Sequence, residues 1–253
     1  MSVILEAHRG AASDYPENTL VAMKAAVALG YGMIELDTKF TADNRCVILH
    51  DRTLARTARR ADGSRIEDDV RVENCTLEAL KTLDFGRWQD EKFAGEPIPT
   101  LEEVLELALE TGVPLKFDNV LQSHTPEQQE ILFATAEKMG ALNVAGFTTN
   151  SVEFAGKILE RLPSAQIHYD GAPDAESIAA ITSIVPPSQL TVWLRYHNER
   201  TAWCRTPAVT PELAAEVKKH ARIGLWLLTR PEELRDAEAL GADFVETDGS
   251  LRP

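Results

Sequence analysis

The feature that most restricts how this chain can fold is a regular alternation of short apolar runs with amphipathic segments. Apolar runs begin at residues 3, 33, 113, 144, 165, 190, 223 and 243. The segments between the later runs repeat their apolar residues with helical spacing and have the length of ordinary helices. Because each helix returns the chain to the same edge of a sheet, strands that alternate with helices pair in parallel. The alternation therefore predicts an α/β fold with a parallel sheet.

Eight such strands fit a single (β/α)8 barrel of the TIM type, for which about 250 residues is a typical length. The expected strands cover residues 3–7, 33–38, 113–118, 144–148, 165–169, 190–195, 223–228 and 243–247, and the expected helices cover residues 20–29, 99–110, 126–139, 151–162, 174–183, 211–221 and 231–240. We expect residues 1–253 to form one barrel domain, with residues 52–97 as an insertion after the second strand. A short helix is expected at 77–83 within it. An open doubly wound sheet is the competing fold, but no Gly-x-Gly-x-x-Gly motif follows the first strand.

The overall charge and the cysteines restrict the partners and the compartment. A formal charge of −14 argues against a nucleic-acid partner and against stable association with an anionic membrane, because both surfaces repel an acidic chain. Cys46, Cys75 and Cys204 are an odd number without Cys-x-x-Cys spacing, so they predict reduced thiols in a cytoplasmic protein. We expect no export signal and no membrane span, because the start has no signal pattern and no apolar run reaches about 18 residues.

A pair of acidic residues in the second expected strand is the first chemical signal. Glu35 and Asp37 are two positions apart, so strand alternation places both carboxylates on one face. A turn at 42–44 and a second extended run at 46–49 then bring His50 and Asp51 back toward the same end. Paired carboxylates suit Mg²⁺ or Ca²⁺, and a nearby imidazole suits proton transfer. Taken alone, the acidic pair fits a solvated surface hairpin better, because carboxylates are mostly exposed.

Reactive side chains at the ends of neighbouring strands favour the chemical interpretation, because the active site of a (β/α)8 barrel lies at the C-terminal ends of its strands. His8 and Arg9 end the first expected strand, and Asp118 ends the third. Glu35, Asp37 and Asp118 would hold one divalent cation and leave positions open for a substrate oxygen. One histidine could then accept a proton while the other donates one, and Arg9 could pair with a phosphate oxygen.

Several short motifs occur in order along the first half of the chain: His8-Arg9-Gly10, Pro16-Glu17-Asn18-Thr19, Ile34-Glu35-Leu36-Asp37, Thr41-Ala42-Asp43, His50-Asp51 and Leu54-Ala55-Arg56-Thr57. Together with Ile98-Pro99-Thr100-Leu101 and Gly241-Ala242-Asp243, this set resembles the signature of the glycerophosphodiester phosphodiesterase family. Residues 120–220 match only in the rhythm of their elements.

The resemblance implies a fold, an activity and residue roles. The implied fold is a (β/α)8 barrel with a small insertion after the second strand. The implied activity is metal-dependent hydrolysis of a glycerophosphodiester, a small-molecule substrate, to glycerol 3-phosphate and an alcohol. His8 and His50 fall on the family's acid–base histidines, and Glu35 and Asp37 fall on two of its metal ligands.

The chain departs from the family pattern at three positions. Asp118 stands where the family usually has a glutamate ligand, and Val120 stands where it usually has a lysine. Thr229 closes the seventh-strand pattern that begins at Trp226, where the family has asparagine. Lys116 lies on the same strand face as Asp118 and is the candidate for the missing phosphate-facing cation.

Other residues at the ends of expected strands allow two interpretations. His168 with Asp170, and Arg195 with His197, could contact a substrate, although a solvated rim is the favoured interpretation. Trp226 could form an apolar wall for the leaving alcohol or could belong to the core. Trp203 lies in a loop that could shape specificity.

Two further functions stay open. Because residues 120–220 resemble nothing specific, the substrate could be a lysophospholipid or a sugar phosphodiester. The departures at Asp118, Val120 and Thr229 also allow a catalytically impaired barrel that binds phosphodiesters without turning them over.

Overall fold

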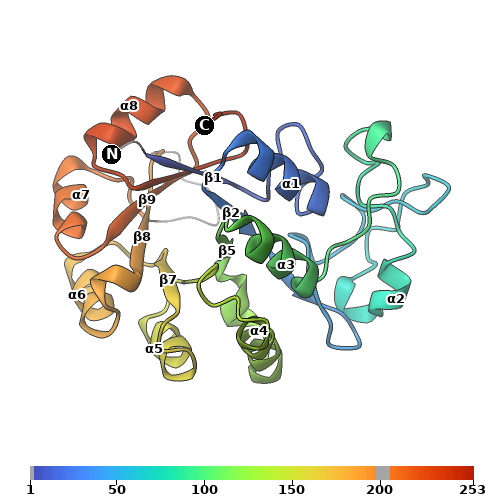
Figure 1. Cartoon of the computed structure of the whole chain (residues 1–253), viewed down its shortest axis with the longest axis horizontal. Helices are drawn as coiled ribbons and strands as arrows, with labels where there is room; N and C mark the ends of the chain where they lie inside the picture. Colours follow the sequence, from blue (N-terminus) through green and yellow to red (C-terminus); the bar gives the residue numbers. More distant parts are fainter. Residues whose placement is uncertain (1–2, 198–205) are drawn as a thin grey trace.

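Eight parallel strands close into a barrel in the computed structural model, which describes residues 3–197 and 206–253 (Figure 1). In order around the ring the strands are β1 (Ile4–Ala7), β2 (Met33–Leu36), β5 (Leu115–Phe117), β6 (Ala145–Thr149), β7 (Gln166–Tyr169), β8 (Leu190–Arg195), β9 (Arg222–Trp226) and β10 (Phe244–Thr247). The ring closes between β1 and β10, where Ile4 lies opposite Phe244. The predicted (β/α)8 barrel is confirmed, and the doubly wound alternative is wrong.

Helices surround the strands (Figure 1). They are α1 (Leu20–Leu29), α3 (Leu101–Thr111), α4 (Pro126–Lys138), α5 (Val152–Arg161), α6 (Ala175–Ile184), α7 (Pro211–Lys218) and α8 (Pro231–Ala239). Two short 3-10 helices, η3 (Asn119–Ser123) and η4 (Pro187–Gln189), lie between β5 and α4 and between α6 and β8. Within residues 3–197 and 206–253, no helix has the length and apolar character needed to cross a membrane.

The helix ends follow from local capping chemistry. At the start of α3 the Thr100 side chain accepts the Glu103 N–H at 3.3 Å, and the Glu103 carboxylate accepts the Thr100 N–H at 2.7 Å. This reciprocal capping box leaves Thr100 outside the helix, so the predicted start at residue 99 was two residues early. Gly112 ends α3 with a φ of 71°, a left-handed conformation that glycine adopts without steric cost.

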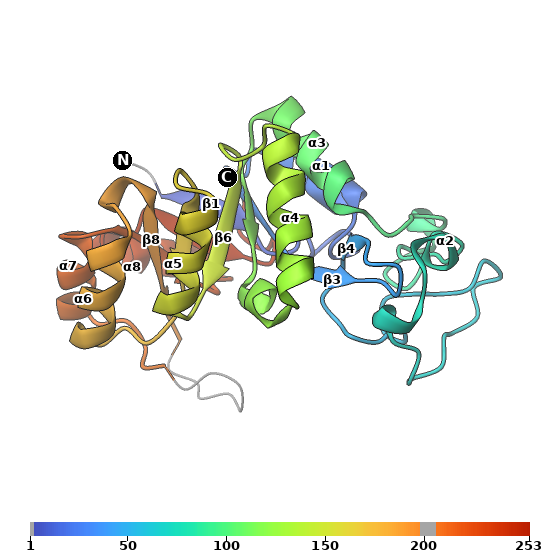
Figure 2. The same ribbon diagram turned by 90° about the horizontal axis from the view of Figure 1, so that it is seen from below.

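The chain leaves the barrel after β2 and forms an antiparallel hairpin. Strands β3 (Thr38–Phe40) and β4 (Cys46–Ile48) pair with Thr38 opposite Ile48, as the turn predicted at 42–44 requires. The following residues contain η1 (Val72–Asn74), α2 (Leu77–Leu80) and η2 (Glu91–Phe93). Figure 2 shows this region extending to one side of the barrel, beyond the hairpin.

Strand β4 contributes to two separate apolar clusters. Cys46 and Ile48 pack in the main cluster between the barrel strands and the helices. Val47 and Leu49, which alternate with them, pack in a second cluster formed largely by the inserted region. Because successive side chains of a strand point to opposite faces, one short strand connects both cores. The residue that follows Leu49 is His50, so this double anchoring fixes the backbone of a predicted catalytic residue.

Candidate active site

One cavity of about 1010 Å³ opens at the C-terminal ends of the barrel strands. All eight residues predicted to act in catalysis, metal binding or substrate binding line it: His8, Arg9, Glu35, Asp37, His50, Lys116, Asp118 and Trp226. The remaining lining residues include Asn119, Thr148, Asn150, Asp170, Trp193 and Glu246. The strand ends therefore bring together residues that are more than 200 positions apart in the sequence.

A tight turn after β1 places His8 and Arg9 in the cavity. Arg9 has a φ of 57° and Gly10 a φ of 83°, and a Cβ on Gly10 would lie 2.9 Å from Ala22. Glycine is therefore required at this position. The His8 Nε2 atom lies 3.9 Å from Oε2 of Glu35 and 4.0 Å from Oε1 of Glu246. Burial lowers the pKa of His8, although the Glu246 carboxylate opposes this shift.

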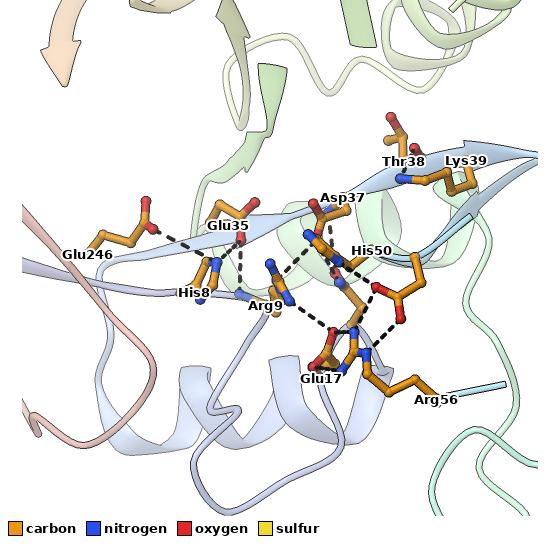
Figure 3. A network of polar contacts seen from close by, with 12 residues as sticks. His8, Arg9, Glu17, Glu35, Asp37, Thr38, Lys39, His50, Arg56 and Glu246 are labelled. Carbon is orange, nitrogen blue, oxygen red and sulfur yellow. Dashed lines mark hydrogen bonds and ion pairs between the residues drawn. The ribbon is translucent and has the colours of Figure 1, made fainter. Parts of the chain in front are cut away.

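Arg9 connects the first loop to the carboxylates of β2. Its backbone N–H donates to Oε2 of Glu35 at 3.0 Å, and its Nε atom lies 3.3 Å from Oδ2 of Asp37. Its Nη1 atom donates to Glu17 at 3.1 Å. The guanidinium is thus held by carboxylates on two sides and contributes positive charge beside the predicted metal ligands (Figure 3).

The Glu17-Asn18-Thr19 segment supports the site with three different side chains. Asn18, in a left-handed conformation with a φ of 56°, donates from Nδ2 to Oδ2 of Asp37 at 2.8 Å. Thr19 caps α1 by accepting the Ala22 N–H at 3.3 Å. Glu17 accepts hydrogen bonds from Arg9 and Arg56. The motif therefore orients a metal-ligand candidate and begins a helix at the same point.

His50 stands at the rim of the cavity and is oriented from the inserted region. Its Nδ1 atom is 2.7 Å from Oδ1 of Asp51, and its side chain is 43% exposed. Arg56 donates to Asp51 from Nε at 2.6 Å and to Glu17 from Nη2 at 2.7 Å (Figure 3). Although burial opposes ionisation, the hydrogen bonds from Arg56 and His50 lower the pKa of Asp51 to about 2. Asp51 is therefore a fixed anion that sets the orientation of the His50 ring.

The three carboxylates predicted to bind metal accumulate negative charge at one place. Burial raises the pKa of Glu35 well above its usual value, and the charges of Asp37 and Asp118 raise it further. Burial and Asp37 also raise the pKa of Asp118. Among the described residues, nothing donates a hydrogen bond to Oε1 of Glu35 or to Oδ1 of Asp37. Buried, mutually repelling carboxylates with free oxygens are the donor type that a hard divalent cation requires.

The carboxylates are not arranged as a preformed metal site. In the two described ranges, no three His, Cys, Asp or Glu side chains are grouped closely enough to hold an ion. Arg9 lies against Asp37, and Asn18 occupies one oxygen of the same carboxylate. The residue types fit Mg²⁺ or Ca²⁺, but side chains must move before the three carboxylates share an ion.

Lys116 lies deep in the barrel and is already paired. Its Nζ atom donates to Glu6 at 2.7 Å and to Glu246 at 2.5 Å, and it lies 3.7 Å from the centre of the Trp193 ring. Burial opposes the charge, but the two carboxylates raise the pKa of Lys116, so the ammonium persists. No role for Glu6 or Glu246 was predicted from the sequence. Both glutamates lie within apolar strands, β1 and β10. This position could have predicted a buried cationic partner, because a buried carboxylate needs one.

The other side chains at the strand ends differ in their positions. His168 is only 4% exposed and accepts a hydrogen bond from Trp193, and Arg195 is only 6% exposed. The interpretation of these two residues as part of a solvated rim is wrong. Asp170 lines the cavity, where burial and then the charge of Asp118 raise its pKa to about 6. Trp203 lies outside the described residues.

Fold and cavity together define a (β/α)8 barrel with an acidic, histidine-containing cavity at the ends of its strands. A family model described as "Glycerophosphoryl diester phosphodiesterase family" matches residues 8–213. A glycerophosphodiester phosphodiesterase of Caldanaerobacter subterraneus is 46% identical over 98% of this chain and 95% of that protein. The chain therefore belongs to the glycerophosphoryl diester phosphodiesterase family, and its predicted place among phosphodiesterase enzymes is confirmed.

Solved structures of other proteins share the fold at lower identity. One from Silicibacter pomeroyi has a TM-score of 0.80 and 21% identity, covering 98% of this chain and 90% of that one. A phosphodiesterase of Oleispira antarctica, solved in complex with the product sn-glycerol-3-phosphate, has a TM-score of 0.76 and 21% identity, covering 98% of this chain and 93% of that one. These likenesses show that the barrel extends over nearly the whole chain.

Proposed function

We propose that this chain hydrolyses small glycerophosphodiesters to glycerol 3-phosphate and an alcohol, using one divalent cation and two histidines. The observation that carries the proposal is that His8, His50, Arg9 and three carboxylates line one cavity in a chain of this family. The product bound to the Oleispira antarctica phosphodiesterase is consistent with this substrate class. We place the reaction in the cytoplasm, which the odd cysteine number favours.

The proposed ligands of the cation are Glu35, Asp37 and Asp118, and Mg²⁺ and Ca²⁺ both suit this oxygen donor set. When bound, the cation would polarise a phosphoryl oxygen and offset the negative charge of the carboxylates. Asp118 is one methylene shorter than the glutamate usual in the family. Whether its carboxylate reaches the cation is therefore the first point to test.

The histidines have complementary environments. Burial lowers the pKa of His8, so its imidazole is neutral near pH 7 and suits the role of general base. His50 is hydrogen-bonded through Nδ1 to the Asp51 carboxylate, which orients the ring, and the proposal gives it the role of general acid for the leaving alkoxide. In this proposal, His8 and His50 carry out the proton transfers of the reaction.

Three further residues contribute substrate contacts in this proposal. Arg9 pairs with a non-bridging phosphate oxygen from its position beside Asp37. Trp226 forms an apolar part of the cavity wall against the leaving alcohol. Lys116 supplies positive charge from the cavity floor, and direct contact with the phosphate would require its ion pair with Glu246 or Glu6 to open.

Direct measurement of product release tests the proposal. The metal-stripped full chain should release no glycerol 3-phosphate from glycerophosphodiesters, and Mg²⁺ or Ca²⁺ should restore release. Parallel assays with lysophosphatidylcholine and a sugar phosphodiester compare the other two substrate classes. Cation-dependent thermal stabilisation with no alcohol released from any of the substrates would instead support a barrel that only binds phosphodiesters.

A further inference from the structure

The proposed chemistry uses residues at the ends of β1, β2, β5 and β9, and it leaves the part of the cavity wall that runs from β5 to β7 without a role. This wall, which we call the polar wall, consists of Asn119 after β5, Thr148 on β6, Asn150 after β6 and Asp170 after β7. Strands β6 and β7 are adjacent, and the Asp170 N–H donates to the Thr149 carbonyl at 3.1 Å. The four side chains therefore belong to one continuous patch of the cavity surface.

Two atoms of the polar wall are buried without a hydrogen-bond partner. Thr148 is 1% exposed, and its Oγ1 atom has no partner among the described residues. The Oδ1 atom of Asp170 is also buried and has no hydrogen-bond partner among the described residues. Leaving a buried polar atom unpaired is costly, so native structures rarely keep one without a reason. Because both residues line the cavity, a ligand that enters it can supply the missing partners.

The orientation of the neighbouring amides is set by their own hydrogen bonds. Thr149 accepts the Ser151 N–H at 2.9 Å and donates to Oε1 of Gln122 at 2.8 Å. Gln122 therefore donates from Nε2 to Oδ1 of Asn150 at 2.8 Å, which leaves the Asn150 amide nitrogen as a donor.

On the other side of the polar wall, Asn119 donates from Nδ2 to Oδ2 of Asp170 and keeps its carbonyl oxygen as an acceptor. The wall thus presents acceptors at Asp170 and Asn119, a donor at Asn150, and a hydroxyl at Thr148 that can do both.

A mixture of donors and acceptors selects among the alcohols that a glycerophosphodiester can carry. A hydroxyl group donates one hydrogen bond and accepts others, so adjacent hydroxyls satisfy both kinds of partner. An ammonium group can only donate, and a trimethylammonium group has no N–H at all and is bound by aromatic faces. One face of the Trp193 ring is already covered by the Lys116 ammonium.

We propose that the polar wall is a subsite for adjacent hydroxyl groups of the substrate, with Asp170 as its specificity-determining residue. The inference rests on the proposed phosphodiesterase function and deepens it. The hydroxyls belong either to the glycerol common to all these diesters or to a polyol or sugar on the leaving side. Both sources share the same chemistry, and substrate comparison separates them.

The test uses the full chain with saturating Mg²⁺ and compares kcat/KM for glycerophosphoglycerol, glycerophosphoethanolamine and glycerophosphocholine. The variants are Asp170→Asn and Thr148→Val, which change the polar atoms at nearly constant volume, and Asp68→Asn at an exposed position as control. Loss of a hydrogen bond to a charged acceptor predicts a fall of about 10- to 100-fold for Asp170→Asn, and a smaller fall for Thr148→Val. The Asp68→Asn variant should match the wild type.

The pattern of losses identifies the source of the hydroxyls. A fall confined to glycerophosphoglycerol places a polyol leaving group on the wall, whereas an equal fall for all three diesters places the common glycerol there. Calorimetric Mg²⁺ affinity should be unchanged in Asp170→Asn, and a lost Mg²⁺ site would overturn the proposal in favour of a metal ligand. Unchanged kcat/KM, or the largest fall with glycerophosphoethanolamine, would also overturn it.

Direct binding of the same diesters keeps the inference separate from the proposed function. If the wild type bound glycerophosphoglycerol more tightly than glycerophosphocholine but released no product from either, the hydrolytic function would fail and the subsite would stand. If the wild type hydrolysed all three diesters and neither variant changed binding or turnover, the subsite would fail and the function would stand.

Discussion

Asn18 holds the Asp37 carboxylate and backbone together. Its Nδ2 atom donates to Oδ2 of Asp37 at 2.8 Å, and its Oδ1 atom accepts the Asp37 N–H at 3.3 Å. Groups that orient a metal ligand determine which of its oxygens can reach the ion. Asn18 therefore belongs to the proposed site although it does not line the cavity.

Replacing Asn18 with alanine tests this orienting role. We expect Asn18→Ala to reduce activity or apparent cation affinity by about 10- to 100-fold, because the Asp37 carboxylate loses its fixed orientation. The measurement is the Mg²⁺ dependence of turnover. Asn143→Ala, at an exposed position, is the matched control and should behave as wild type. If Asn18→Ala showed the cation dependence of the wild type, the hydrogen bond from Asn18 to Asp37 would not be needed for metal binding.

The environment of His8 predicts the acidic side of the pH–rate profile. A general base acts in its deprotonated form, and burial lowers the pKa of His8 from 6.5. The active form therefore persists below pH 6.5, and the acidic decline of kcat/KM should have its midpoint below that value. A profile measured on the Mg²⁺-loaded enzyme checks this. A midpoint above 6.5 would assign the decline to another group.

At the scale of elements, strand β4 determines where His50 stands. The sequence predicted the extended run and the turn before it, because both are local patterns. It did not predict that Val47 and Leu49 would face a second apolar cluster while Cys46 and Ile48 face the first. Which core a strand face meets depends on the packing of residues 52–97, whose periodicity is weak, so local patterning could not supply it.

A cavity in the second cluster should loosen the hairpin. Leu54 is 1% exposed in this cluster, and Leu54→Ala should lower the free energy of unfolding by about 2–5 kcal/mol. Turnover should also fall, because His50 directly follows Leu49, which packs in the same cluster. Urea unfolding and kcat/KM measure both effects. Leu109→Ala, at a side chain that is 39% exposed, is the control and should change little. If a destabilised Leu54→Ala protein kept normal turnover, the packing of the second cluster would not be needed to position His50 for catalysis.

At the scale of the whole molecule, the alternating pattern was sufficient to predict the barrel and the edge at which its site lies. The eight predicted site residues share one cavity for this reason. Their partners were not predictable, because Glu6 and Glu246 meet Lys116 only when the ring closes. The same holds for the Asn119–Asp170 contact, which joins two loops across β6. We propose that the barrel and the 52–97 insertion form one domain, since β4 packs in both cores.

The accumulated carboxylates predict how cation-free stability depends on pH. Glu35 and Asp118 have raised pKa values in the folded chain, so between the unfolded and folded pKa values the folded state binds more protons. The free energy of unfolding should therefore fall as pH rises through this window. Mg²⁺ at 100 times its dissociation constant should add about 2.7 kcal/mol.

Unfolding between pH 5 and 8, with chelator or with Mg²⁺, measures this dependence, and a single transition would agree with one domain. Glu35→Gln should flatten the pH dependence without cation and weaken the effect of Mg²⁺. Stability that rises with pH in chelator, or a Mg²⁺ effect that survives in Glu35→Gln unchanged, would contradict the assignment of the metal ligands.

The turnover of single-histidine variants tests the central claim most directly. The measurement is glycerol 3-phosphate release from a glycerophosphodiester by the Mg²⁺-loaded His8→Ala and His50→Ala proteins, with surface His220→Ala as control. We predict that each cavity variant falls by about 10²- to 10⁴-fold while keeping its fold, and that the control keeps wild-type turnover. Near-normal release by either His8→Ala or His50→Ala would contradict the proposed acid–base pair.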